Sequence, residues 1–512
     1  MRLSSRLLRR DQAPSGRTSP EKKVTMSIAE SPVFTTLVPL HPAAYAELAA
    51  RIDGVVTTPS DADWNTARLA WNLSADQRPD AVVAPRHAED VRTTLLFARD
   101  HQLRVVPQGT GHLASPLGDL AGSILLRTGG LLGIDIDAEE LTVRVGAGVL
   151  WGDVTAALAE RGLMALAGSS PDVGVVGYLL GGGISWFARS MGLAASHVTA
   201  IEAVSGDGRL LRATAEEEGE LFYALRGGGG NYAVVTAITF RVFAVRDAYA
   251  GMMMFPMERA DELLGAWERW TRELDESAMT CFRLMRVPDL PELPEFLRGQ
   301  KLVIIDGVVA IEQAEGGADP TAPTGRTADA GRTADAEALL APLRALGPFL
   351  DTFGVMPVSR LGELHMDPPG PVPGTGDGVN LDELPRAAID ALLGLTGPDA
   401  QTPLMVVDIR HIGGQLAIAA PDGGAVNRLH GRFLLFTGGM SPSPADAAVL
   451  HAAVARVLEA LAPWQAAADY LNFREVATPA ERLYPVDTLA RLRAAKRRYD
   501  PSGRIRSAHP LQ

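Results

Sequence analysis

The chain has 512 residues, of which 46% are hydrophobic, enough to bury more than one large core. Its formal net charge of −13 argues against a nucleic-acid-binding protein, which would carry a basic surface. The single cysteine, Cys281, excludes an internal disulfide and a zinc site built from several cysteines. These limits favour an enzyme that acts on a small molecule.

The N-terminal segment, residues 1–34, contains arginines but no apolar stretch of the kind that forms a secretory signal. We expect a disordered tail there. The sequence contains no run of 18 or more apolar residues, so we expect no membrane span. Together these features predict a cytoplasmic protein.

Strands and helices alternate in the first half of the chain. The apolar run at 81–84 predicts a strand, and helical spacing follows from Ala88 to a second strand that ends in VVP. Residues 141–147 alternate apolar and polar side chains, which predicts a half-buried strand. Asp207-Gly208 predicts a hairpin, because glycine supplies the positive φ of a tight turn.

Near Val245 the residue pattern changes. Apolar strand-like runs then alternate with two stretches that predict helices, 260–274 and 444–464. This pattern predicts a second α+β domain. Residues 313–336 contain the hexamer GRTADA twice and predict a mobile low-complexity insertion. Residues 366–378 are rich in proline and glycine and predict a loop that covers a pocket.

Three glycine-rich turns stand beside strand-like sequence: PQGTGH at 107–112, GGG at 181–183 and GGGG at 227–230. Glycine lets backbone N–H groups approach an anion closely. The first turn lacks the Gly-Lys-Ser/Thr of a nucleotide-phosphate loop, and it does not match the nicotinamide fingerprint. Two interpretations remain open, namely three turns around one extended ligand, or ordinary tight turns.

His112 ends the first glycine turn. The sequence shows no His-x-x-x-His and no nearby pair of carboxylates, so a metal site is disfavoured and we expect none. A surface or core histidine and a point of covalent cofactor attachment are the other interpretations.

Several motifs resemble, in order, those of the FAD-linked oxidases of the vanillyl-alcohol oxidase superfamily, and most closely the berberine-bridge-enzyme-like subgroup. They are PQGTGH, GSSPDVGVVGYLLGGGISWFARSMGL, LFYALRGGGGNYAVVTAITFRVF and YLNF followed by RLRAAKRRYDPSGRIRSAHP. The resemblance implies an α+β fold with a bipartite FAD-binding domain, 35–245 and 465–512. It also implies a substrate-binding domain at 246–464, with an antiparallel sheet backed by helices.

The same resemblance implies the cofactor-binding residues. They are Pro107, Gln108, Gly109, Thr110, Gly111, His112, Leu113, Gly168, Ser169, Ser170, Val173, Gly174, Tyr178, Gly182, Val235, Tyr470 and Asn472. His112 would hold FAD covalently. Ser170 stands where many relatives place a second attachment, a cysteine, so a single link is expected.

Other positions bear on the reaction. Val173 resembles the small residue that, in relatives, gives oxygen access to the flavin, which favours an oxidase over a dehydrogenase. Phe473 stands where several relatives have a second tyrosine. Ala508 stands where an asparagine is common, which puts one cofactor contact in doubt.

Tyr470, Asp408 and His411 are the candidate catalytic residues. A tyrosine with a pKa near 10 is a poor base unless nearby positive charge lowers that pKa. On the strand that contains them, Asp408 and Arg410 share one face and His411 lies on the other. Each of the strand residues could equally be an ordinary polar residue on the sheet.

The resemblance therefore predicts an FAD-dependent oxidase. It would transfer a hydride from an alcohol, sugar or secondary-metabolite carbon to flavin and then to oxygen, giving hydrogen peroxide. A flavin-dependent dehydrogenase and a non-catalytic ligand-binding protein with a degenerate flavin fold remain open. The expected partners are a small-molecule substrate and molecular oxygen, with no nucleic acid and no membrane. The sequence does not indicate the substrate or the oligomeric state.

Overall fold

The computed structural model describes residues 40–291, 293–311, 326–368 and 370–511. The tail expected at 1–34 lies outside them. All described residues belong to one unit, Leu37–Gln512. No helix among the described residues is long and apolar enough to cross a membrane.

A four-stranded sheet with the order β1-β2-β4-β3 comes first. Strands β2 and β3 both pair in parallel with β4, and α3 connects them. Helix α3 begins after His87, whose ring nitrogen accepts a hydrogen bond from the Asp90 N–H. The elements are α1 (Pro42–Ala49), β1 (Val55–Thr57), α2 (Trp64–Ala67), β2 (Ala81–Ala84), α3 (Ala88–Asp100), β3 (Arg104–Gln108) and β4 (Ser123–Arg127).

A five-stranded antiparallel sheet with the order β5-β6-β9-β7-β8 follows. Gly208, with φ +87°, turns the chain from β7 into β8 and confirms the predicted hairpin. The strands are β5 (Ile134–Asp137), β6 (Thr142–Gly146), β7 (Val198–Ser205), β8 (Leu210–Ala213) and β9 (Ala233–Arg241). The helices are α4 (Trp151–Ala159), α5 (Val175–Leu180), α6 (Ala188–Met191) and α7 (Gly219–Leu225).

The largest sheet has the order β13-β10-β12-β11-β16-β17-β15, with β14 also paired to β10, and its pairings are antiparallel. Its first strands are β10 (Asp247–Pro256), β11 (Ala278–Arg286), β12 (Lys301–Val309) and β13 (Leu350–Asp351). The others are β14 (Gly354–Pro357), β15 (Gly374–Leu381), β16 (Val406–His411) and β17 (Phe433–Met440).

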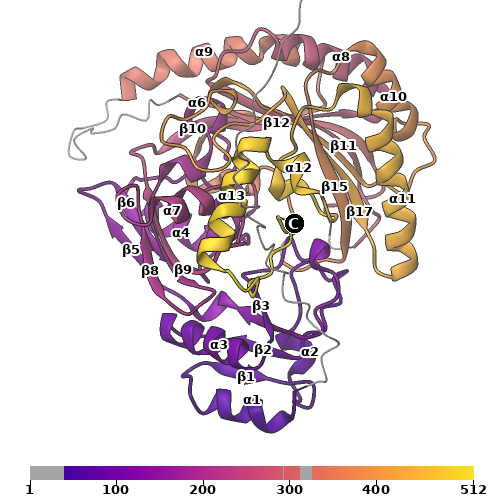
Figure 1. Ribbon diagram of the computed structural model, residues 1–512. Helices are drawn as coiled ribbons and strands as arrows, with labels where there is room; N and C mark the ends of the chain where they lie inside the picture. The colour runs from indigo at the N-terminus through magenta and orange to yellow at the C-terminus, as the bar shows by residue number, and fades with distance from the viewer. Residues whose placement is uncertain (1–39, 292, 312–325, 369, 512) are drawn as a thin grey trace, which may run out of the picture. The chain divides into compact units, whose positions relative to one another are not determined.

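Four helices cover one face of this sheet (Figure 1). They are α8 (Ala260–Thr271), α9 (Arg326–Arg344), α10 (Arg386–Thr396) and α11 (Pro444–Ala460). Trp267 of α8 and Val454 of α11 pack with Phe282 and Phe433 of the sheet in one buried core. Strand residues of the opposite face, Cys281 among them, belong instead to the core of the N-terminal sheets. The large sheet therefore buries both of its faces.

The C-terminal segment returns to the first part of the chain. Helix α12 (Ala480–Leu483) leads into α13 (Val486–Tyr499), which contacts α7. Beyond α13, Ile505 forms a parallel bridge with Val105 of β3, and both side chains lie in one core. A bipartite domain requires this arrangement, while the domain boundaries themselves stay a prediction.

Most elements expected from the sequence are present, but some expectations change. Leu141 lies outside β6, because its φ is +50°. The insertion predicted at 313–336 falls outside the described residues as far as 325, but from Arg326 the chain forms α9. Ala336 is buried in the core under the large sheet, so this part of the repeat is not a mobile insertion.

Candidate active site

His112 lies in the loop after β3, stacked on an indole. Its ring centroid is 4.0 Å from that of Trp71, with 17° between the planes. The Thr110 hydroxyl lies 2.7 Å from Nδ1. The other nitrogen, Nε2, is buried and makes no hydrogen bond among the described residues. The ring is therefore held in place, and its Nε2 lies beyond hydrogen-bond distance of any described polar group.

Asp172 faces that nitrogen, with Oδ1 3.5 Å from Nε2 of His112. The same carboxylate accepts hydrogen bonds from Trp71 Nε1 at 2.5 Å and from the Ser170 hydroxyl at 2.9 Å. Burial alone would raise the pKa of Asp172, but His112, Trp71 and Ser170 outweigh burial and lower it to about 2. The sequence analysis did not select Asp172, although it lies between Ser170 and Val173.

The turn at 181–183 brings a second group of side chains together. Gly183 has φ +77°, and a Cβ there would lie 2.4 Å from the Tyr178 ring. A Cβ on Gly181 would lie 1.8 Å from Oδ1 of Asn472. These glycines are needed because protein side chains approach their backbone, which favours the tight-turn interpretation for this cluster.

Tyr470 packs into the same turn. Its hydroxyl accepts hydrogen bonds from the Gly183 N–H at 2.9 Å and from the Asn472 amide at 3.1 Å. Burial raises the pKa of Tyr470 above 10, while those two bonds and the charge of Arg410 lower it by less. Tyr470 is therefore suited to donate a hydrogen bond rather than to act as a base.

The large sheet turns a row of charged side chains away from its helices. Arg283 of β11 contacts Asp306 of β12 at 2.5 Å, and Oδ2 of Asp306 lies 3.0 Å from Nδ1 of His365. On the other side of its ring, His365 Nε2 lies 3.3 Å from Oδ2 of Asp408. Asp408 in turn accepts a hydrogen bond from Arg410 Nε at 2.9 Å. We call these five residues the charge row.

The pKa values within the charge row are strongly coupled. Burial tends to raise the pKa of Asp408, but Arg410, His365 and Arg283 lower it below its usual range. Burial and Arg283 tend to lower the pKa of His365, but the carboxylates of Asp306 and Asp408 raise it. The row therefore has two carboxylates, two guanidinium groups and a histidine whose charged form is favoured.

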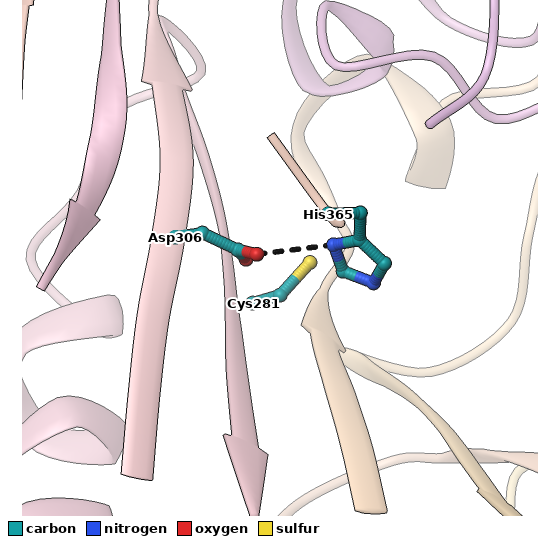
Figure 2. Close-up of side chains that lie close together, drawn as sticks. All are labelled: Cys281, Asp306 and His365. Carbon is teal, nitrogen blue, oxygen red and sulfur yellow. Dashed lines mark hydrogen bonds and ion pairs between the residues drawn. The ribbon is translucent and has the colours of Figure 1, made fainter. Parts of the chain in front are cut away.

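Figure 2 shows the Asp306 carboxylate and the Cys281 thiol, on neighbouring strands, pointing toward the His365 ring. One ligand atom from each lies within 4.8 Å of the other two, a spacing suited to a metal ion. However, the Arg283 guanidinium already pairs with Asp306. Burial, Asp408 and Asp306 also raise the pKa of the Cys281 thiol well above 9. The arrangement thus favours a hydrogen-bonded charge network over a cation site.

The Phe473 ring contacts both the charge row and Tyr470. The Arg410 guanidinium carbon lies 4.9 Å from the centroid of Phe473. The Phe473 and Tyr470 rings are 5.6 Å apart. Two of the predicted catalytic residues, Tyr470 and Asp408, are thereby brought into one region.

His411 lies elsewhere. As the alternation of the strand predicts, its side chain points to the helix-covered face, where it contacts Trp267 and Phe433. Its Nε2 is 3.0 Å from Nη1 of Arg189. Burial, followed by Arg189 and Arg432, lowers the pKa of His411 to about 2, so the ring is neutral. The structure does not bring His411 to Tyr470.

The other predicted cofactor-binding residues fall into two groups. Some are buried or hydrogen-bonded to other protein groups, and the rest lie mostly in loops. The Gln108 amide exchanges hydrogen bonds with Gln77, and Val235 is buried in β9. The Tyr178 hydroxyl donates to the Leu166 carbonyl. The loop positions are Gly109, Gly111, Leu113, Gly168, Ser169 and Gly174, while Pro107 lies at the end of β3. A Cβ on Gly109 or Gly174 would meet nothing nearer than 3.8 Å, so their backbone is open to a ligand.

Two of the four glycines at 227–230 are closely packed. A Cβ on Gly227 would lie 2.6 Å from Val426, and one on Gly228 would lie 2.2 Å from the Ala224 carbonyl oxygen. Gly230 is the roomier position, with its nearest neighbour at 3.8 Å. Close packing against protein atoms again favours tight turns here.

The Pro/Gly loop after His365 crosses the loops beside His112. The Gly370 N–H donates to Oδ2 of Asp172 at 3.3 Å, and the Leu73 N–H donates to the Val372 carbonyl at 3.0 Å. From Gly374 the predicted loop becomes strand β15.

Two cavities flank this region. One of about 420 Å³ is lined by Ser170, Trp186 and Leu361, among others. One of about 390 Å³ is lined by Ala114, Ser115 and Glu475, among others.

The comparisons with known proteins identify the part of the chain that contains His112 and Asp172. Residues 79–214 match the FAD binding domain family. This segment is an FAD-binding domain. An uncharacterized FAD-linked oxidoreductase of Bacillus subtilis is 30% identical over 229 residues, 44% of this chain and 51% of the relative. The chain thus spans about half the length of that curated relative.

Solved structures show the fold that surrounds the FAD-binding domain. The Physcomitrella patens BBE-like 1 protein matches with a TM-score of 0.76 and 18% identity, over 91% of this chain and 99% of that one. Glucooligosaccharide oxidase from Acremonium strictum matches with a TM-score of 0.72 and 19% identity, over 92% and 99%. The fold is that of the berberine-bridge-enzyme-like flavoproteins, as the sequence motifs predicted, and its α+β class is confirmed.

The residues of the FAD-binding domain fit its cofactor. The space beside Gly109 and Gly174 would let an anionic phosphate approach the backbone of this loop region. Nε2 of His112 is buried without a hydrogen bond from the described residues and lies 3.5 Å from the Asp172 carboxylate, so the two side chains form a polar site beside this loop.

Sequence reasoning missed three members of the charge row: Arg283, Asp306 and His365. A charged residue inside an apolar run, as Asp306 is in VIIDGVV, was a usable signal. His365 precedes the Pro/Gly loop, and no local pattern connects it with Asp306 or Asp408.

Proposed function

We propose that this protein is an FAD-dependent oxidase. Its substrate is a small molecule with an alcohol, hemiacetal or amine-bearing carbon. That carbon gives a hydride to the flavin, and molecular oxygen then takes the electrons and becomes hydrogen peroxide. The strongest support is the position of Tyr470 near the charge row, where the Phe473 ring contacts both Tyr470 and Arg410, beside the FAD-binding domain.

Tyr470 orients the substrate in this proposal. Its oxygen already accepts two hydrogen bonds, so its own proton is available for a substrate oxygen. Asp408 is the candidate acceptor of a hydrogen bond from the substrate's hydroxyl group, because its Oδ1 is buried without a hydrogen-bond partner among the described residues. When bound, FAD supplies the two-electron acceptor.

The charge row favours loss of the hydroxyl proton. With His365 protonated, its two arginines and one histidine exceed its two carboxylates by one positive charge. A net positive charge in a site shielded from water stabilises the negative charge that develops on a substrate oxygen.

His112 is the proposed point of covalent attachment, and Ser170 makes that link the single one. Glucooligosaccharide oxidase, which shares the fold, has a 6-S-cysteinyl, 8α-N1-histidyl FAD. In this chain a serine cannot form the thioether. Val173, which follows Asp172, is the proposed point of oxygen access.

The test is a substrate panel on the FAD-loaded protein without oxygen, with flavin absorbance as the readout. We expect bleaching by at least one alcohol, sugar or amine, and hydrogen peroxide when air is admitted. Asp408→Asn should slow bleaching by about 10²-fold or more, whereas Asp351→Asn at the sheet edge should not. If no compound reduces the bound flavin, the protein is not an oxidoreductase for these classes. Bleaching without peroxide would indicate a dehydrogenase.

A further inference from the structure

Asp172 is held more firmly than its place in a loop suggests. Oδ2 accepts hydrogen bonds from Trp71 Nε1 and the Gly370 N–H, and Oδ1 accepts one from the Ser170 hydroxyl. These donors come from three separate segments of the chain. They fix the carboxylate in one orientation, with Oδ1 toward Nε2 of His112.

The surroundings of His112 specify one tautomer. An ionised carboxylate at Nε2 attracts an N–H and repels a lone pair, so the ring proton belongs on Nε2. Nδ1 then bears the lone pair, and the Thr110 hydroxyl at 2.7 Å donates to it. Trp71, stacked at 4.0 Å, fixes the ring plane and favours a positive charge on the ring.

We propose that Asp172 is the positioning residue for covalent attachment of FAD to His112. Its carboxylate keeps the ring proton on Nε2, which leaves Nδ1 as the nucleophile, and it stabilises the positive charge that forms on the ring during attachment. The arrangement corresponds to the aspartate that orients the histidine of a serine-protease triad.

One C–H bond of the flavin 8α-methyl group is replaced by a C–N bond to Nδ1 of His112. The methyl carbon and the imidazole each release one proton, and two electrons pass to the flavin ring. Molecular oxygen then takes those electrons and two protons and becomes hydrogen peroxide. Asp172 lowers the barrier at the imidazole, whose proton on Nε2 it holds until that proton leaves.

This inference rests on the proposed attachment at His112, so the experiment measures attachment separately from turnover. Apo-protein is mixed with FAD in air, and samples are precipitated with acid over time. Flavin that stays with the precipitate is covalent, and the peptide that bears it is identified by mass spectrometry. Non-covalent binding of FAD is measured in parallel by fluorescence quenching.

We expect Asp172→Asn to bind FAD as the parent does but to attach it at least about 10²-fold more slowly. The matched control is Asp367→Asn, a nearby carboxylate that lies 3.4 Å from the Ser169 hydroxyl. That variant should attach FAD at the parental rate. A second variant, Asp172→Ala, should regain attachment when formate is added, because formate can occupy the vacated carboxylate position.

The outcomes separate the two proposals. If the parent attaches FAD at His112 and Asp172→Asn does so equally fast, the role of Asp172 is overturned while the attachment site stands. If the parent holds FAD only non-covalently, attachment itself fails and this inference fails with it. Slow attachment in Asp172→Ala that formate leaves unchanged would indicate a purely structural role and would also overturn the inference.

Discussion

At the scale of single residues, the site is determined by hydrogen bonds that leave particular atoms available. Tyr470 accepts two bonds at its oxygen, so the proton of that hydroxyl is what the side chain can offer. Burial keeps the pKa of Tyr470 above its ordinary value, which argues against the role of base. Asp408 is ionised, with one oxygen used by His365 and Arg410.

Replacing Tyr470 with phenylalanine tests that role. The ring and its packing against Phe473 remain, so FAD binding should persist. Anaerobic flavin reduction by a substrate should slow by about 10²–10⁴-fold, the usual contribution of a positioned proton donor or acceptor. The matched control is Tyr499→Phe in α13, which removes a hydroxyl that donates a hydrogen bond to Glu218. Reduction at the parental rate would remove Tyr470 from the mechanism.

Gly183→Ala should damage the site through the backbone. The residue has φ +77°, and a methyl group would lie 2.4 Å from the Tyr178 ring. We expect a loss of about 1–3 kcal/mol in unfolding free energy, together with weaker FAD binding. Gly177→Ala in α5, where a Cβ meets nothing within 4 Å, should be neutral or slightly stabilising. Denaturant unfolding and FAD titration of both variants decide the matter, and equal behaviour would refute the packing argument.

At the scale of elements, α9 contains a repeat whose composition does not reveal how it packs. The composition of the GRTADA repeat predicts little burial, yet α9 begins at Arg326 and Ala336 is fully buried beneath the large sheet. A small alanine can pack closely between a helix and a sheet, which composition alone does not reveal.

Two deletions of this segment should therefore differ. Removing 313–325, which offers few apolar residues, should leave FAD content and the thermal midpoint near those of the parent. Removing 313–336 should lower the midpoint, because it shortens α9 and takes Ala336 from the core. Thermal scans of both proteins provide the measurement, and equal midpoints would contradict the assignment of Ala336 to the core.

At the scale of the whole molecule, Arg189 of α6 connects the FAD-binding domain with the large sheet. Its guanidinium donates to the carbonyl oxygens of Ala278 at 2.7 Å, Ile412 at 2.9 Å and Asp275 at 2.8 Å. The residue is only 4% exposed. The three acceptors lie beside the sheet, so the arginine holds the sheet against the FAD-binding domain.

Arg189→Met should destabilise the protein, because buried carbonyl groups lose their donors at about 1–3 kcal/mol each. We expect the unfolding free energy to fall by about 3 kcal/mol or more, with weaker FAD binding. The control is Arg209→Met, which breaks an exposed pair with Asp207 and should cost no more than about 1 kcal/mol. A loss at Arg189 no greater than this control would refute the connecting role.

Local patterns in the sequence were enough to predict the individual elements and the motifs of the FAD-binding domain. Periodicity predicted α3, β6 and α11 because burial of one face imposes a repeat that each segment shows alone. Alternation along β16 likewise separated Asp408 from His411 before any partner was known. The order of the glycine motifs pointed to the flavoprotein fold.

Which side chains meet, by contrast, depends on how distant segments pack together. Asp172 reaches His112 because Trp71 and Gly370, from distant segments, hold its carboxylate. The charge row likewise joins strands β11, β12 and β16 with His365. Sheet register and loop crossing set these contacts, and both depend on long-range packing that no local pattern encodes.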